Sequence, residues 1–354
     1  MPISIASYYD PYIYTKEVAH LFSGPQYIGA TGMAPSDDDY RALERFDESK
    51  LLIRKNGNYK LLDNICAHRQ AKIVRGAGHG HRFSCALHRW AYDGDGKVVH
   101  TPHYEGDVAH LCLKQTPIQI WNGMIFTQGD DFIADMEAHP LRHHMELDHL
   151  VYQSTISDPI DVNWKHYMDG FAENYHVPFV HPGFVSLINL DTLSWTDHPR
   201  YHTQILRARS VDELKARKMT PAYKHWVDLM LDYYQGVLPD PIGVLVHYYP
   251  NIMLEWYPGF LVMNTVHPNG VGAMTCHIDL FHDAEMLEKR PDLCAAARAA
   301  YDETVNEDVD LCVRLAEGRK YLYDQGREDQ GPYQGLFEEG LEMFHRYYNA
   351  AMKC

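Results

Sequence analysis

Apolar and polar residues alternate over short runs in the first third of the chain, the period expected of half-buried β-strands. Three such runs cover residues 39–46, 50–55 and 58–64, and turn-forming Asp, Gly and Asn residues separate them. A further run at residues 123–128 ends this region. We therefore predict an antiparallel β domain, preceded by a short helix over residues 10–22.

The rest of the chain keeps its strands apart from its helices. Residues 146–160 form a strand-like segment, and four further strands fit between residues 243 and 281. Residues 211–235 and most of residues 285–354 have a helical pattern. This segregation predicts an α+β protein in which helices cover an antiparallel sheet.

The length of 354 residues suggests two domains. We place the β domain at residues 25–130 and the second domain at residues 131–354. The N-terminal helical segment, residues 1–24, is expected to pack on the second domain. Hydrophobic residues make up 45% of the chain, which is enough for a core in each domain.

Two short Cys/His pairs lie within the β domain. One residue separates Cys66 from His68, two separate Cys85 from His88, and sixteen lie between the pairs. Each pair offers a thiolate and an imidazole from one loop, so two loops could clamp a [2Fe–2S] cluster. Cys66 and Cys85 would hold one iron, and His68 and His88 the other. Two neutral imidazoles lower the negative charge of such a cluster and raise its potential, which suits an electron relay.

A structural zinc site is the simplest alternative for these four residues, since zinc accepts the same ligand types. Zinc modules usually pair like with like, Cys with Cys and His with His. The mixed pairs therefore favour the cluster over zinc.

A second group of candidate metal ligands follows the strand at residues 146–160. If residues 162–175 form a helix of 3.6 residues per turn, one face is an apolar stripe made of Trp164, Met168, Phe171 and Tyr175. Asp169, Glu173 and His176 then project together from another side, at spacings i, i+4 and i+7. These three side chains are expected to serve a common site.

The same segment supplies a pair of imidazoles. Pro178 is expected to end the helix, which leaves His181 on the exit loop beside His176. Two imidazoles and one carboxylate form the facial triad of mononuclear non-haem iron, with open positions for O2 and water. Any one of these residues alone could instead be a hydrogen-bonded core or surface group.

Asp308 is the best candidate for the missing carboxylate. It lies at the edge of an apolar helical face formed by Val305, Val309, Cys312, Leu315 and Ala316. Glu307 and Asp310 are expected to point the other way, and a buried carboxylate is costly unless it is paired or coordinated. The alternative is a solvated acid on the helix surface.

These motifs together resemble the Rieske non-haem iron oxygenases, in their oxygenase-component (alpha) subunit. The resemblance covers nearly the whole chain, including residues 90–104 and 248–270. It implies an antiparallel β Rieske domain and a catalytic domain of helix-grip, or START-like, fold. The family often has Gly at the positions of Gln70 and Arg89, so we expect the backbone beside the cluster to differ here.

The high-potential Rieske protein of cytochrome bc complexes is a second alternative for the cluster loops. Its loops carry an extra pair of cysteines, joined as a disulfide, where this chain has Ala71 and Leu87. The oxygenase type is therefore favoured, and a missing disulfide suits a reducing cytoplasm.

The resemblance also implies roles for individual residues. A carboxylate at the position of Glu173 bridges the two metal centres in this family without being a ligand. Cluster and iron of one subunit are too far apart for useful electron transfer, and the working pair lies across a subunit boundary in a head-to-tail homotrimer. His88 would then hydrogen-bond Glu173 of the partner subunit, which contacts a ligand histidine. Asp169 is assigned with Glu173 to the catalytic group.

The function implied is that of a terminal oxygenase with one [2Fe–2S] cluster and one mononuclear Fe(II) per subunit. It would use O2, and electrons from NAD(P)H through a separate reductase or ferredoxin, to hydroxylate or demethylate a small molecule. The ligand helix is similar to that of enzymes acting on choline-, betaine- or carnitine-like quaternary ammonium compounds. Hydroxylation or O-demethylation of aromatic rings is an alternative, by mono- or dioxygenation. An iron–sulfur electron carrier or sensor without a second iron is an alternative of another class.

Candidates for the walls of a substrate pocket come from two tracts of the second domain, and they are Phe184, Ile188, Tyr248, Met253, Trp256 and Tyr257. The chain has 25 Tyr and 6 Trp, which could build an aromatic cage for a quaternary ammonium group but are more often ordinary core residues. A pocket lined by rings together with a carboxylate would favour amines as substrates.

Charge and cysteine usage narrow the class further. The net charge of −16 argues against nucleic acid as a partner, because binding a polyanion relies on clusters of Lys and Arg. No apolar run could span a bilayer and no secretory signal begins the chain, so we expect a cytoplasmic protein without a membrane partner. Five further cysteines show no paired spacing and are expected to be free thiols: Cys112, Cys276, Cys294, Cys312 and Cys354.

Overall fold

The protein is described here by a computed structural model that covers all residues except 128, 130, 147–148 and 354. The chain forms two compact units, one of Met1–Gly24 with His139–Cys354 and one of Pro25–Ala138. The smaller unit ends at Ala138 rather than at residue 130, because it includes helix α2 (Asp131–Ala138). Phe132 of α2 packs on Phe126 with their ring centroids 4.4 Å apart.

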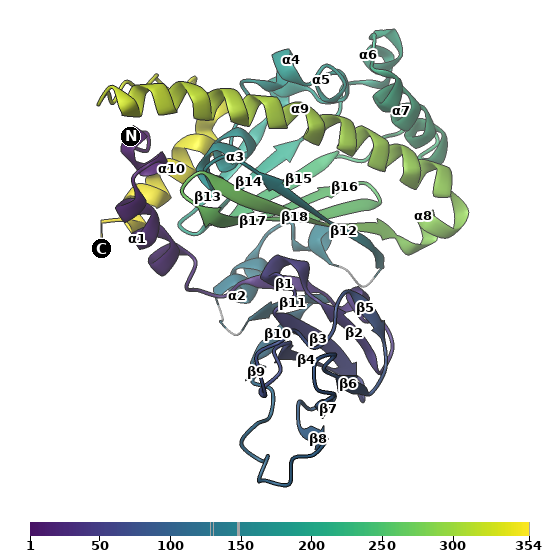
Figure 1. The fold of residues 1–354 in the computed structure, drawn as a ribbon. Coiled ribbons are helices and arrows are strands. Elements are labelled where there is room, and N and C mark those ends of the chain that lie inside the picture. Colours follow the sequence, from purple (N-terminus) through teal and green to yellow (C-terminus); the bar gives the residue numbers. More distant parts are fainter. Residues whose placement is uncertain (128, 130, 147–148, 354) are drawn as a thin grey trace. The chain divides into compact units, whose positions relative to one another are not determined.

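Antiparallel strands make up the smaller unit (Figure 1). A five-stranded sheet has the order β5 (Ala77–His79), β2 (Asp39–Ala42), β3 (Lys50–Lys55), β4 (Asn58–Asp63), β9 (Gln115–Thr116). Two three-stranded sheets are β6 (Arg82–Ser84), β7 (Ala91–Asp93), β8 (Val98–His100), and β1 (Tyr27–Ala30), β11 (Met124–Thr127), β10 (Ile118–Trp121). The expected strands at residues 50–55 and 58–64 are present as β3 and β4. One Cys/His loop follows β4, and the other joins β6 to β7.

The larger unit is built on one seven-stranded antiparallel sheet. Its strand order is β12 (Leu150–Ile160), β18 (Ala273–Asp283), β17 (Phe260–Gly270), β16 (Ile252–Tyr257), β15 (Gly243–Tyr248), β14 (Tyr201–Leu206), β13 (Ser194–His198). The four strands expected between residues 243 and 281 are therefore confirmed. Gln204 pairs with Leu245, and Leu245 pairs with Glu255, so these three side chains lie side by side on one face.

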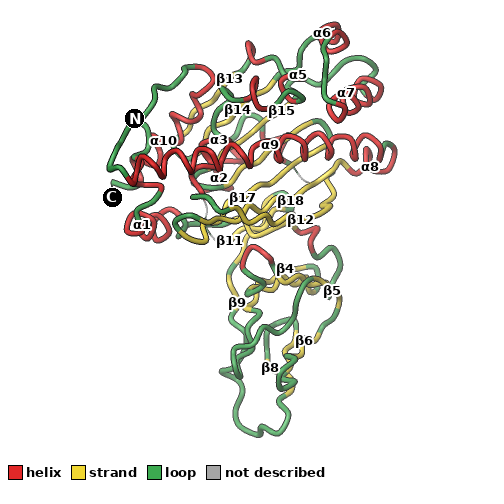
Figure 2. The backbone as a smooth tube through the Cα atoms, turned by 45° about the horizontal axis from the view of Figure 1, so that its top comes forward, coloured by secondary structure: helices red, strands yellow, loops and turns green. Residues whose placement is uncertain are grey.

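Helices cover that face of the sheet (Figures 1 and 2). The longest is α9 (Pro291–Asp324), which packs with α7 (Pro221–Tyr233) and the sheet in one hydrophobic core. The other helices of this unit beyond residue 138 are α3 (Trp164–Phe171), α4 (Val177–Val180), α5 (Phe184–Leu187), α6 (Val211–Ala216), α8 (Ala284–Lys289) and α10 (Glu339–Ala351). None of the helices in the described part of the chain is both long and apolar enough to cross a membrane.

The N-terminal segment packs on the larger unit. It contains the 3₁₀ turn η1 (Ile5–Tyr8) and helix α1 (Pro11–Leu21). Glu17 of α1 is fully buried and lies 2.7 Å from Nζ of Lys165 on α3, which is buried as well. Because a buried ion pair is costly to break, it holds the segment firmly against α3.

The single helix expected over residues 162–175 is wrong. Helix α3 ends at Phe171, and the amide of Asn174 donates to the carbonyl oxygen of Phe337 instead of continuing the helix. Pro178 does not end a helix, because it lies in the first turn of α4. Trp164 and Met168 are buried as expected, but Tyr175 is 47% exposed.

Candidate functional site

The two Cys/His loops of the smaller unit have matching backbone hydrogen bonds. The amide of Cys66 donates to the carbonyl of Ala71 at 2.8 Å, and the amide of Cys85 donates to the carbonyl of Trp90 at 2.8 Å. Both cysteines are buried and neither forms a disulfide. The two loops therefore present their thiols in the same way.

Gln70 and Arg89 occupy equivalent turns in these loops. Their φ angles are 56° and 59°, the left-handed region that favours glycine. The chain thus keeps a glycine-type backbone beside the thiols without glycine, at a cost of about 1 kcal/mol for each residue. Replacing Gly at these two positions therefore changes the side chain and adds strain, but it keeps the φ angle that glycine favours.

Of the two imidazoles of these loops, that of His88 is exposed and that of His68 is partly buried. The rings of His68 and His88 are 4.7 Å apart, and His68 stacks on Trp90 at 4.8 Å. Nδ1 of His68 is buried and has no hydrogen-bond partner among the described residues. Two buried thiols with two imidazoles on their outer side, one with an unused nitrogen, fit a [2Fe–2S] cluster with Cys₂His₂ ligands.

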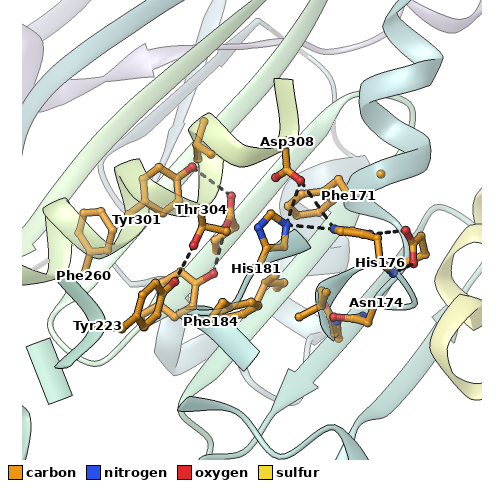
Figure 3. A pocket seen from close by; sticks show the side chains of 18 of the residues that line it. Phe171, Asn174, His176, His181, Phe184, Tyr223, Phe260, Tyr301, Thr304 and Asp308 are labelled. Atoms are coloured by element: carbon orange, nitrogen blue, oxygen red, sulfur yellow. Dashed lines mark hydrogen bonds and ion pairs between the residues drawn. The ribbon is translucent and has the colours of Figure 1, made fainter. Parts of the chain in front are cut away.

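His176, His181 and Asp308 come together in the larger unit (Figure 3). The Nε2 atoms of the two histidines are 3.1 Å apart. Oδ1 of Asp308 lies 2.9 Å from Nε2 of His181 and 3.7 Å from Nε2 of His176. Asp308 reaches this site from the middle of α9, 127 residues beyond His181 in the chain.

A carboxylate beside Nδ1 of each histidine determines which ring nitrogen carries the proton. Nδ1 of His176 contacts the carboxylate of Glu173, and Nδ1 of His181 lies 2.8 Å from Oε2 of Glu307. A carboxylate at Nδ1 keeps the proton there, which leaves a lone pair on each Nε2. Two lone pairs facing a carboxylate repel one another without a cation, so the donor set fits Fe(II).

The charges around His181 also favour a bound cation. Its burial disfavours the charged imidazolium, but the neighbouring carboxylates of Asp308 and Glu307 outweigh burial and raise the pKa of His181. The site therefore attracts positive charge. The expectation that Glu307 points away is wrong, because α9 turns both Glu307 and Asp308 toward His181.

Asp169 does not join this group. It is buried between Tyr8, Arg319 and His345, whose polar atoms lie 2.7, 2.6 and 3.0 Å from its carboxylate oxygens. The break after Phe171 turns Glu173 and His176 away from the helix face that carries Asp169. Burial by itself would raise the pKa of Asp169. The positive charge of Arg319, together with the hydrogen bond from His345, has a larger opposite effect and holds the pKa of this carboxyl well below its ordinary value.

A pocket of about 760 Å³, counting its open mouth, adjoins the two histidines and Asp308 (Figure 3). One face of α9 lines it, with the residues Ala297, Tyr301, Thr304, Val305 and Asp308. The sheet supplies the opposite wall: Gln204, Leu245, Glu255, Tyr257 and Phe260. Further aromatic rings complete the lining: Tyr167, Phe171, Phe184, Tyr223 and Trp226.

Of the six residues expected in the pocket, Phe184 and Tyr257 line it. Strand alternation turns Tyr248 and Trp256 to the other face of the sheet, where their rings approach those of Tyr201 and His144. The remaining two, Ile188 and Met253, are buried in the hydrophobic core.

Sequence reasoning missed Glu255, a buried carboxylate in the wall of this pocket. The hydroxyl of Tyr257 donates to its Oε2 at 3.1 Å, and that of Tyr301 to its Oε1 at 3.4 Å. Burial nevertheless raises the pKa of Glu255 to about 7. The available signal was a single acidic residue within an otherwise apolar strand, residues 252–257.

Comparison with known families and proteins agrees with this geometry. Residues 138–353 match the family model of the ring hydroxylating alpha subunit (catalytic domain), and residues 26–117 match that of the Rieske [2Fe-2S] domain. Putrescine 2-hydroxylase of Ralstonia nicotianae is 32% identical over 351 residues, which cover 99% of this chain and 95% of that protein. Choline monooxygenase of Spinacia oleracea is 23% identical over 98% of this chain and 77% of its own length.

Solved structures share the fold. A quaternary ammonium Rieske monooxygenase superposes with a TM-score of 0.76 and 16% identity, over 99% of this chain and 94% of its own. Naphthalene 1,2-dioxygenase from Rhodococcus sp. gives a TM-score of 0.73 with 18% identity, again over 99% and 94%. The chain belongs to the Rieske non-haem iron oxygenases, as an alpha subunit that carries a [2Fe–2S] cluster and a mononuclear iron.

Proposed function

We propose that this oxygenase acts on a small aliphatic amine in its cationic form. The observation that carries the proposal is Glu255, a carboxylate buried among aromatic rings in the pocket that also contains His176, His181 and Asp308. Ring faces attract a cation, and a carboxylate adds the opposite charge. The named substrates of the relatives, putrescine and choline, both carry a positively charged nitrogen, as a primary ammonium and a quaternary ammonium group respectively.

In this proposal Fe(II) is held in the larger unit by His176, His181 and Asp308. The [2Fe–2S] cluster is held in the smaller unit by Cys66, His68, Cys85 and His88. The iron supplies O2 activation, with electrons that a separate reductase or ferredoxin delivers. The reaction balances as R–H + O2 + 2 e⁻ + 2 H⁺ → R–OH + H2O. The rings of the pocket exclude bulk water from the reacting carbon.

We also propose that the working pair of metal centres forms between subunits of a head-to-tail homotrimer. Leu87, beside His88, is 59% exposed, and Phe179, three residues beyond His176, is 79% exposed. Large apolar side chains left exposed beside both centres suit a contact between copies. Glu173 would then connect the cluster of one copy to the iron of the next. Glu173→Gln is expected to abolish substrate-dependent O2 uptake while three irons per chain remain, and full activity of this variant would contradict the assignment.

A screen of O2 uptake with a surrogate reductase tests the proposed substrate class. The purified protein is expected to contain three irons and two acid-labile sulfides per chain. Putrescine, butan-1-amine and choline are compared with benzoate and other aromatic acids. Uptake that depends on an amine supports the proposal. O2 uptake with aromatic acids alone would contradict the amine class and favour ring hydroxylation or O-demethylation. Two irons per chain and no O2 uptake with any compound would favour an electron carrier.

The proposal places the enzyme in the cytoplasm. The support is that none of the cysteines in the described part of the chain forms a disulfide, as a reducing compartment would keep them. Cys354 lies outside the described residues. Fractionation of the native source tests this, because recovery with periplasmic or membrane markers would contradict it.

A further inference from the structure

Glu255 lies in the wall of the pocket without a cationic partner. It projects from β16 on the same face of the sheet as Leu245 and Gln204. No Lys, Arg or His among the described residues pairs with it, and its hydrogen-bond partners are the hydroxyls of Tyr257 and Tyr301. Its side chain is nevertheless only 6% exposed.

Two other buried acids of this unit, Glu17 and Asp169, differ from Glu255 in this respect. Glu17 lies 2.7 Å from Nζ of Lys165, and Asp169 lies 2.6 Å from Nη1 of Arg319. Each of these two carboxylates therefore has a cation beside it in the core. At Glu255 the charge is left open toward a cavity, which is where a ligand can supply the opposite charge.

The hydrogen bonds at Glu255 suit one kind of cation. Both tyrosine hydroxyls donate to the carboxylate, one to each oxygen, so each phenol oxygen keeps lone pairs for a further donor. The carboxylate and the two phenol oxygens together offer acceptors for the three N–H groups of a primary ammonium. A quaternary ammonium has no N–H group and would leave these buried acceptors without a partner.

We propose that Glu255, with Tyr257 and Tyr301, binds the primary ammonium group of the substrate and selects it over a quaternary ammonium. This inference rests on the proposed function and adds the residue that sets its substrate class. Phe260, whose ring centroid lies 5.6 Å from that of Tyr301, supplies part of the aromatic wall beside the charge.

The same geometry orients the rest of the substrate. Tyr301 and Asp308 lie on one face of α9, seven residues apart, which is about 10 Å along the helix axis. The ammonium is therefore held at a distance from the metal ligand, and the carbon chain runs along α9 toward His176 and His181. Oxidation falls on a carbon within that chain.

Binding to the holoenzyme tests the selection directly. Isothermal titration calorimetry compares butan-1-amine with N,N,N-trimethylbutan-1-aminium, which have the same carbon chain and charge. The wild-type protein is expected to bind the primary amine at least about tenfold more tightly. Glu255→Gln is expected to weaken the primary amine on the order of 100-fold and to remove the preference, because it deletes the charged acceptor of a buried pair. Tyr257→Phe and Tyr301→Phe should each cost the primary amine about tenfold and the quaternary amine little.

A matched control removes another carboxylate of α9. Glu317 is exposed, and it does not line the pocket. Glu317→Gln is expected to bind both amines as the wild-type protein does. Equal loss in Glu255→Gln and Glu317→Gln would show a general effect of charge and overturn the assignment.

The outcomes separate this inference from the proposed function. If the wild-type protein binds both amines equally and Glu255→Gln changes neither affinity, the selection by Glu255 is wrong while the amine class stands. If neither amine binds or stimulates O2 uptake and an aromatic acid does, the proposed function fails and this inference fails with it. Retained visible absorption of the cluster and three irons per chain confirm that each variant is loaded.

Discussion

Replacement of Glu255 by glutamine is expected to stabilise the larger unit above neutral pH, whatever the substrate is. Burial raises the pKa of Glu255 from its ordinary value of 4.5 to about 7; hydrogen bonds from Tyr257 and Tyr301 act against burial, and the charge of Asp308 adds to it. Between these two pH values the folded chain holds a proton that the unfolded chain has released. The stability of the wild-type protein therefore falls as the pH rises from about 4.5 to about 7.

The size of this effect follows from the same numbers. A rise of the pKa from 4.5 to about 7, at about 1.4 kcal/mol for each unit, corresponds to about 3 kcal/mol. Glu255 is only 6% exposed, so solvent reduces this free energy very little. Gln is similar in size and cannot ionise. Glu255→Gln should thus match the wild-type protein near pH 4.5 and exceed it by about 3 kcal/mol above pH 7.

Scanning calorimetry at one heating rate, from pH 5 to pH 8.5, measures the difference. For a unit of this size about 3 kcal/mol corresponds to roughly 6–12 °C in Tm. Visible absorption of the cluster reports the smaller unit separately, and its transition should not change. Glu317→Gln serves as the control, since it removes the same charge from an exposed site outside the pocket. Parallel Tm curves for Glu255→Gln and the wild-type protein would refute the reasoning, because Glu255 would then ionise in the folded chain as freely as in the unfolded one.

Three further substitutions test the iron site and its surroundings. Asp308→Ala should lower the iron content from three to two per chain and leave the visible spectrum of the cluster unchanged; three irons by metal analysis would exclude Asp308 as a ligand. Glu307→Gln should weaken Fe(II) binding about 10- to 100-fold in a reconstitution titration, since it removes the acceptor behind His181, and unchanged affinity would argue against this role. Asp169→Asn should destabilise the larger unit by about 3 kcal/mol by leaving a buried cation unpaired, while an unchanged Tm with lost activity would indicate a catalytic role instead.

The sequence predicts best where ligands are close together in the chain. His176 and His181 are five residues apart, so their backbones can hardly separate, and the structure brings their Nε2 atoms to 3.1 Å. Asp308 is predicted from its place at the edge of an apolar helical face, and Val305 and Cys312 of that face do pack into hydrophobic cores. The helix before the histidines was predicted too long, because the bond that ends it comes from Phe337, more than 160 residues away. Helical periodicity holds no information about such a distant partner.

Glu307 and Glu255 could not be recognised for a related reason. The sequence predicts that Glu307 points away from the site, because only the apolar face of its helix is expected to pack inward. In the structure His181 contacts both Glu307 and Asp308. Glu255 is the single acidic residue of an otherwise apolar strand, residues 252–257, so the pattern does not show which face of this strand is covered. It is buried only because α9 covers that side of β16. An acidic residue in a strand therefore indicates a ligand site only when the element that packs over it is known. Over Glu255 that element is α9, which contacts it through Tyr301 and not through a lysine or arginine.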